Sequence, residues 1–425
     1  MEKNKNAKKS FHYAWVMLFV ATLTLGVYVP IVNSLSNSWQ LAVTKDLGFS
    51  RTAFSLGGTI AQSIGIFLGP IMSYYLTKYN FKRIWTVAAV LFACAVFGYS
   101  MAQNQYHFYI LAVVVGACYI ATAHIPMMML INNWFEDKIG LATSIAVSGI
   151  SGGGALLSPI INSLIKNVGW RMSYRVYAFI ILALAIVFGV FLIYLKPEDK
   201  GLQPYGHGED DEEKEIKKKK DNDYSLNVGL SISASITCIF FIFLILGAVM
   251  NGLSNGATLQ FPPALIGAAG YDVASAVMAT YLVLGVFGKL LLGRIADKYG
   301  IYHAIAFGAS TLALTFVAML FIDKAWGPYL MAVIFGFGLA IGSVIPPLIT
   351  STIFNREVYG EAYGFVTSGV QIGAAMGPLI VSYIFDSQGS YTWAWILNIS
   401  FALLTGFFWF LAHKSAEKYK DKSEK

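Results

Sequence analysis

The chain has 425 residues, of which 56% are hydrophobic and 12% are charged, and its formal net charge is +7. Soluble globular domains contain about a quarter charged residues, so this composition excludes a soluble protein and predicts a polytopic membrane protein. Because the lysines gather in the tails and in one loop beside apolar stretches, the positive charge reflects membrane orientation, and no nucleic-acid partner is expected.

The first apolar run extends from Tyr13 to about Val32 and follows a basic start, Lys3 to Lys9. It is longer than the hydrophobic region of a signal peptide and is followed by many more apolar runs, so we expect an uncleaved first helix. A spanning helix needs about 20 mostly apolar residues. Twelve windows meet this requirement and predict an all-α protein with twelve transmembrane helices: 13–38, 53–76, 84–102, 107–133, 141–165, 174–195, 229–260, 273–296, 302–322, 327–353, 362–385 and 393–412.

The three cysteines are Cys94, Cys118 and Cys238, and each falls inside an apolar window. They are far apart in the sequence, so they suggest neither a disulfide framework nor a metal cluster. We interpret them as small packing residues and expect no metal site and no cofactor.

One long polar segment, residues 196–226, separates the sixth window from the seventh and contains the charged run EDDEEKEIKKKK. Such blocks of charge are solvated and flexible, so we interpret the segment as a cytoplasmic linker. It divides the chain into an N-terminal six-helix bundle, residues 1–195, and a C-terminal six-helix bundle with a short basic tail, residues 227–425.

The orientation follows from the positions of the lysines and arginines. Most of them lie in both tails, in the linker and in the connections on the same side of the predicted bundle. The positive-inside rule therefore places both termini and the linker in the cytoplasm, with the chain in the plasma membrane. The opposite connections contain only Lys45, Arg51, Lys166, Arg171, Arg175 and Lys324.

The two halves of the chain resemble each other. A shift of about 220 residues superposes 77–80 (TKYN) on 297–300 (DKYG), and Gly140 on Gly360. Matches with one shared offset over several helices predict the duplication of a six-helix unit, as is common in transporters.

The same shift relates two glycine-rich helices, SGISGGGALLSP with Gly149 and Pro159, and SGVQIGAAMGP with Gly369 and Pro378. Small residues let membrane helices approach closely, and a proline frees a carbonyl, so these helices can pack tightly and bend. They are candidates for the place where the two halves move, and ordinary close packing is the alternative.

The eighth window ends with GRIADKYG, in which Gly293, Arg294, Asp297, Lys298 and Gly300 combine a turn with paired charges. We interpret these residues as a conformational switch, a clasp that forms when the cytoplasmic side closes and breaks when it opens. The first half has a threonine in place of the acid, so a weaker clasp is expected there.

Lys289 is the one Lys, Arg, Asp or Glu deep inside an apolar window, because Arg175 and Arg294 lie within three residues of a window end. A charged side chain deep in hydrocarbon costs at least about 2.5 kcal/mol, so it is tolerated mainly where it faces a protein interior or a watery cavity. Lys289 is therefore the first candidate for a substrate site. The alternative is that its long side chain reaches the membrane interface, because Gly293 follows only one turn later.

Polar residues of the central helices are further candidates to contact the substrate. His124 is the other group deep in a span that titrates near neutral pH, because His107 and His303 lie at window ends. It either carries a proton, bonds substrate or serves packing. Buried amides and hydroxyls need partners, so bonding between helices is the alternative for each of the others. These are Tyr28, Asn33, Gln62, Asn251, Asn255, Ser343 and Gln371.

The six-plus-six pattern, the long linker and the GRIADKYG turn resemble the major facilitator superfamily over nearly the whole chain. LGFSRTAFSLGGTI, NWFEDKIGLATS, GWRMSY and LKPEDKGLQPYG are similar, more narrowly, to the oxalate/formate antiporter and monocarboxylate porter branch. The resemblance implies the major facilitator fold, two pseudo-symmetric six-helix bundles, and secondary active transport.

In that branch a cation at the position of Lys289, usually arginine, binds the substrate carboxylate. The oxalate/formate members have a second lysine in the eleventh helix, where this chain has Val370 beside Gln371, so the resemblance favours a monocarboxylate. Proton-coupled members often have a carboxylate where this chain has Gly285. If His124 is only structural, exchange or facilitated diffusion replaces proton symport.

The expected function is secondary transport of a small organic anion, most simply a monocarboxylate, by alternating access, with proton symport or anion exchange. The substrate, protons and the lipid bilayer are the expected partners, and an oligomer is not required. The alternatives are an exporter of neutral or amphiphilic compounds and a transporter-like membrane sensor. An enzyme is not expected, because the spans lack paired carboxylates, metal-spaced histidines and a nucleophile with its base.

Overall fold

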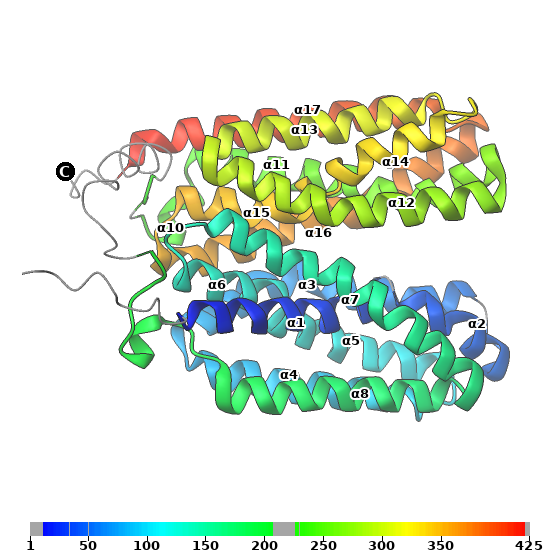
Figure 1. The fold of residues 1–425 in the computed structure, drawn as a ribbon, viewed down its shortest axis with the longest axis horizontal. Coiled ribbons are helices and arrows are strands. Elements are labelled where there is room, and N and C mark those ends of the chain that lie inside the picture. Colours follow the sequence, from blue (N-terminus) through cyan, green and yellow to red (C-terminus); the bar gives the residue numbers. More distant parts are fainter. Residues whose placement is uncertain (1–11, 34, 50, 207–225, 229, 421–425) are drawn as a thin grey trace, which may run out of the picture.

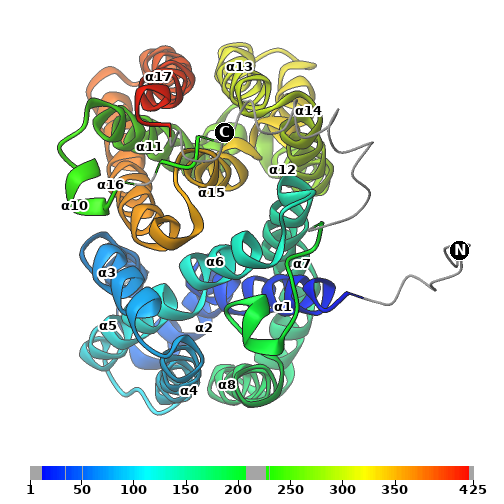
Figure 2. The same cartoon turned by 90° about the vertical axis from the view of Figure 1, so that its left-hand side faces the viewer.

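Twelve helices in the described part of the chain are long and apolar enough to cross a membrane, as predicted. The structure is a computed structural model that describes residues 12–33, 35–49, 51–206, 226–228 and 230–420. Its elements form two helical bundles that lie side by side, with α1 to α8 in the first and α11 to α17 in the second (Figures 1 and 2). The expected all-α fold is therefore confirmed.

The first bundle contains six membrane spans, and its fourth span is divided into α5 and α6. A short π-helical turn, Val187–Leu192, completes the sixth span. The helices are α1 (Ala14–Val32), α2 (Ser36–Leu47), α3 (Arg51–Lys78), α4 (Phe81–Tyr99), α5 (Gln105–Thr122), α6 (His124–Trp134), α7 (Ile139–Val168) and α8 (Trp170–Ile186).

The second bundle repeats this plan, with the tenth span divided into α14 and α15. Gly270 has a positive φ of 81° inside α12 and separates the end of the seventh span from the eighth. The helices are α11 (Ile239–Ala257), α12 (Phe261–Tyr299), α13 (Ile301–Met319), α14 (Gly327–Gly338), α15 (Ile341–Ile353), α16 (Arg356–Gln388) and α17 (Thr392–Ala416), with a short α10 (Ile232–Ser235) before them.

The first and the seventh predicted windows differ from the spans of the structure. The first span ends at Val32 rather than at residue 38, and the polar helix α2 follows it as a separate element. The seventh span begins at Ile239 rather than at residue 229 and continues to Gly270. The two windows included residues of α2 and residues 232–235, which form short helices outside the spans.

The two ends of the molecule differ. We call the end that carries residues 12–13, 196–206 and 416–420 the linker end, and the opposite end, with α2, the α2 end (Figure 1). At the linker end, Phe135 pairs with Tyr205 and Phe354 pairs with Val228 in isolated backbone bridges. The linker therefore joins both bundles next to the loops that follow α6 and α15. Its charged run lies outside the described residues.

Close packing inside each bundle explains the glycine-rich helices. A Cβ atom on Gly149 of α7 would overlap the Thr22 backbone of α1, and a Cβ on Gly369 of α16 would lie 3.2 Å from the Ala248 side chain of α11. Both glycines therefore pack within a bundle rather than between the bundles. Pro378 lies inside α16.

At the α2 end, the Asp46 carboxylate accepts hydrogen bonds from Arg171 and from the Trp170 indole, which lowers the pKa of Asp46 from its ordinary value of 3.8. Because the pKa is lower in the folded state, this contact stabilises the fold above that value and is lost as the pH falls through the lowered pKa. We expect Asp46→Asn to reduce the melting temperature slightly, because the site is exposed. The reduction should be equal at about pH 5.5 and about pH 7.5 in thermal unfolding scans. A difference between the two would contradict the assignment.

Candidate functional site

A cavity of about 1000 Å³ lies between the two bundles. The first bundle lines it with residues of α1, α3, α5, α6 and α7, and the second with residues of α11, α12, α15 and α16. Helices from both halves therefore share one site, as in transporters built from repeats. Of the nine residues predicted to contact substrate, seven line this cavity: Asn33, Gln62, His124, Asn255, Lys289, Ser343 and Gln371.

Lys289 is the centre of the site. Its side chain extends from α12 toward α7, where Nζ donates a hydrogen bond to Ser151 Oγ at 2.9 Å. The residue is only 4% exposed, so its ammonium group faces the protein interior and the alternative of interfacial snorkelling is wrong. None of the lining residues that the structure describes is Asp or Glu. The ammonium group therefore has no anionic partner in the cavity wall.

His124 lies where the fourth span is interrupted. Ala123 has a non-helical backbone, with φ −97° and ψ −108°, and His124 begins α6 directly after it. Irregular backbone at membrane depth is tolerated where it lines a cavity. Lys289 and His124 line the same cavity from opposite bundles. A proton on His124 and the charge of Lys289 would therefore lie in the same cavity.

Two predicted contact residues do not line the cavity, and the prediction is wrong for them as direct contacts. Tyr28 is buried, its hydroxyl donates to the Ile181 carbonyl at 3.2 Å, and its ring stacks on Phe92 inside the first bundle. Asn251 is also buried, and its side-chain oxygen accepts from Asn255 Nδ2 at 2.9 Å. Asn251 therefore orients Asn255, which does line the cavity.

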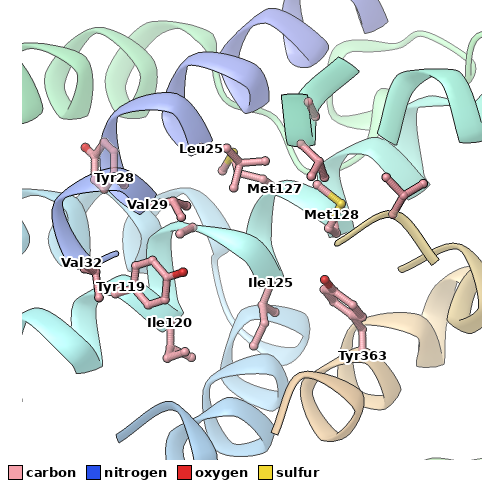
Figure 3. Packing of buried hydrophobic residues seen from close by; sticks show 14 of the residues in the cluster. Leu25, Tyr28, Val29, Val32, Tyr119, Ile120, Ile125, Met127, Met128 and Tyr363 are labelled. Atoms are coloured by element: carbon pink, nitrogen blue, oxygen red, sulfur yellow. The ribbon is translucent and has the colours of Figure 1, made fainter. Parts of the chain in front are cut away.

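Several polar lining residues were missed from the sequence, among them Ser151, Tyr119 and Tyr363. Ser151 was hidden in a glycine-rich packing segment, although a serine among glycines is a signal of a polar group at a close helix contact. Tyr119 of α5 and Tyr363 of α16 are nearly buried and come from opposite bundles. Their hydroxyl groups point toward the space between them (Figure 3). They form a hydroxyl-bearing part of the cavity wall that only the packing of the bundles reveals.

Contacts between the bundles close the linker end. The Asp297 carboxylate of α12 accepts hydrogen bonds from the backbone N–H groups of Gly140 at 2.7 Å and Leu141 at 2.8 Å, at the start of α7. A carboxylate is favoured there because a helix N-terminus carries partial positive charge. A salt bridge between Arg356 and Glu136, at 3.1 Å, also joins the two halves. Asp297, one of the predicted switch residues, thus lies in a contact between the two bundles.

The other residues of the predicted switch have different positions. Gly293 packs against Gly140, because a Cβ on Gly293 would lie 2.8 Å from the Gly140 carbonyl carbon. Arg294 and Lys298 are exposed, and Gly300 turns the chain with a φ of 86°. Pro159 lines the cavity instead.

The equivalent contact of the first half involves Thr77 of α3 and Gly360 of α16. A Cβ on Gly360 would lie 2.8 Å from Thr77 Oγ1, and that hydroxyl donates to the Ser73 carbonyl of its own helix at 2.8 Å. The threonine hydroxyl bonds within α3 and carries no charge. The two bundles therefore meet here by packing and without a charged group, as expected for the weaker clasp of the first half.

Comparisons with known proteins agree on one family. A family model described as Major Facilitator Superfamily matches residues 14–353 and 244–425. Monocarboxylate transporter 11 of Mus musculus is 22% identical, over 93% of this chain and 86% of its own length. An MFS-type transporter of Gibberella moniliformis is 24% identical, over 87% of this chain and 82% of its own length.

Solved structures show the same fold. The transporter FucP in the outward conformation has a TM-score of 0.69 with 13% identity, covering 94% of this chain and 99% of FucP. The proton:xylose symporter XylE, bound to 6-bromo-6-deoxy-D-glucose, has a TM-score of 0.68 with 15% identity, covering 94% of this chain and 95% of XylE. At these identities the likeness is one of fold.

Proposed function

The chain belongs to the Major Facilitator Superfamily, and we propose that it moves a small organic anion, a monocarboxylate, across the plasma membrane by alternating access. The family and the fold are those of transporters rather than enzymes, and the chain is a multi-pass membrane protein. Beyond the family and the fold, we propose the class of substrate, the coupling to protons and the orientation in the membrane.

The observation that carries the proposal is the buried ammonium group of Lys289. It lies in the cavity between the bundles, it is bonded to a neutral hydroxyl, and no acidic side chain is among the described lining residues. A buried charge is costly unless it is paired, and a substrate carboxylate would supply the partner. A lysine neutralises a carboxylate as a point charge, so one lysine suits one carboxylate.

The curated relatives support the same substrate class at a distance. Two of them, in mouse and human, are named monocarboxylate transporter 11, each 22% identical to this chain. Other relatives are fungal MFS transporters whose names give no substrate class. The relatives therefore favour a carboxylate without distinguishing among carboxylates.

We assign the linker end to the cytoplasm, because most of the Lys and Arg residues of the connections lie there. The contacts of Asp297 and of Glu136 with Arg356 close that end, so this conformation is the outward-facing one. Transport requires these contacts to break as the cavity opens to the cytoplasm. The carrier thus alternates between closure at the linker end and closure at the α2 end.

We assign proton coupling to His124, with anion exchange as the alternative that the experiment separates. His124 and Lys289 line the same cavity, so a proton on the imidazole and a carboxylate on the lysine can enter together. In proteoliposomes, an inward proton gradient should stimulate uptake of labelled monocarboxylates by the parent protein, and His124→Ala should remove the stimulation but keep exchange.

The matched control is His303→Ala, because His303 is an exposed histidine of α13 outside the cavity. It should keep the full stimulation. If the proton gradient still stimulates uptake by His124→Ala, a residue other than His124 carries the proton. No effect of the gradient on the parent protein would leave exchange as the mechanism.

A further inference from the structure

The part of the cavity wall next to Lys289 is apolar. Leu282, Val283, Val286 and Phe287 precede Lys289 on α12 and line the cavity on the side of the α2 end. At a rise of 1.5 Å per residue, this surface extends about 10 Å from the lysine. Leu282, Val283 and Phe287 are 49%, 62% and 57% exposed, so much of their surface is uncovered.

Helix α7 extends the same wall on the other side of the Lys289 hydrogen bond. Ala155 and Pro159 follow Ser151 by one and two turns, on the same side of the helix, and line the cavity together with one hydroxyl-bearing residue of this stretch, Ser158. The two helices run in opposite directions, yet both apolar stretches lie toward the α2 end from the ammonium and hydroxyl groups. A polar anchor thus lies at the inner end of an apolar wall formed by α7 and α12.

The amide side chains of the cavity come from other helices. Asn33 directly follows α1, Gln62 belongs to α3, Asn255 to α11 and Gln371 to α16. The cavity therefore has an apolar side beside its cation and an amide-bearing side that is built by different elements. Such a distribution suits a ligand that is itself polar at one end and apolar along its length.

The size of the cavity points to the same kind of ligand. About 1000 Å³ is the upper part of the range that holds drug-sized molecules. An acid of two or three carbons paired with Lys289 would leave the apolar wall in contact with water. A longer acid would cover it and gain hydrophobic stabilisation with each added methylene.

Resting on the proposed transport of a monocarboxylate, we propose that the substrate is an amphiphilic monocarboxylate. Its carboxylate binds Lys289 and Ser151, and its apolar chain or ring lies along the wall of α7 and α12. The apolar wall, rather than the cation, then sets which carboxylates are preferred.

The test is a series of straight-chain acids from acetate through butyrate, hexanoate and octanoate to decanoate. Binding is measured by calorimetry on the protein in lipid nanodiscs, with empty nanodiscs subtracted because longer acids partition into lipid. We expect the dissociation constant to fall about three- to fourfold per added methylene over the middle of the series.

Val286→Thr, which keeps the side-chain shape but adds a hydroxyl to the wall, should weaken the binding of octanoate several-fold and leave acetate unchanged. Val333→Thr is the matched control, because Val333 of α14 is 49% exposed and does not line the cavity. It should leave the whole series unchanged.

An affinity that stays constant or falls with chain length would overturn this inference and leave carboxylate transport intact. The proposed function fails in a different way. If Lys289 does not recognise a carboxylate, hexanamide should bind the parent protein as tightly as hexanoate. Lys289→Ala should then change the affinities of the two compounds equally. The dependence of affinity on chain length thus tests the apolar wall, and the comparison of the acid with the amide tests Lys289.

Discussion

Lys289→Ala is expected to reduce carboxylate transport to near background. Hydrogen bonds to charged groups contribute about 1.5 to 3 kcal/mol, so losing the ammonium group should lower kcat/KM by about 10- to 150-fold. Lys289→Arg should keep part of the activity, because it retains the charge but changes its shape and reach. The measurement is uptake of a labelled monocarboxylate into proteoliposomes.

Two variants separate the role of the charge from general damage. Lys166→Ala removes an exposed lysine of α7 that does not line the cavity, and it should transport normally. Ser151→Ala removes the neutral partner of Lys289 but keeps the ammonium charge, so it should lower uptake less than Lys289→Ala does. Full uptake by Lys289→Ala would refute the assignment of the substrate site.

Lys289 could be identified from the sequence because the signal is local. A single charge within an apolar window needs a protein interior, and the cavity provides one. The twelve spans are equally local, because each needs only its own apolar residues. Ser151, Tyr119 and Tyr363 could not be identified in this way. Their place in the cavity wall depends on which helix faces meet across the bundles, and apart from the glycines around Ser151 their segments carry no signal of it.

Tyr28 and Asn251 show the same limit from the other side. Both are polar residues in apolar spans, like Asn33 and Asn255. Tyr28 and Asn251 are buried and do not line the cavity, whereas Asn33 and Asn255 line it. Because Asn251 and Asn255 are four residues apart on one helix face, only their depth distinguishes them. A sequence pattern gives the face of a helix but not how far a cavity reaches along it.

The duplication explains why the site is asymmetric. The shift of about 220 residues relates Lys289 to Gly69, and Gln371 to Ser151. In the structure, Lys289 meets Ser151 between α12 and α7, while Gln371 lies over Gly65 between α16 and α3. Under the predicted duplication these two interfaces are equivalent, and only one of them has a cation. The proposed ligand, with one charged end, fits this asymmetry.

Gly293→Ala is expected to shift the carrier strongly toward the state that is open at the linker end. Its Cβ would lie 2.8 Å from the Gly140 carbonyl carbon, closer than packed atoms approach, so α7 and α12 cannot close there without moving apart. Overpacking of this kind typically costs about 1 to 3 kcal/mol. The cost applies to the closed state only, which corresponds to a shift in the equilibrium of about 5- to 150-fold.

The shift can be measured as the distance between spin labels on Arg83→Cys of α4 and His303→Cys of α13, in a variant without the native cysteines. Both residues are exposed, and each lies near the start of its helix at the linker end. The distance distribution should move to longer values in Gly293→Ala, and uptake should fall. Gly267→Ala is the control, because a Cβ there meets nothing within 4 Å.

Asp297→Asn should shift the distribution in the same direction but less, because it removes the charge at the α7 N-terminus and keeps the packing. An unchanged distribution in Gly293→Ala would show that the contact between Gly140 and Gly293 does not control closure.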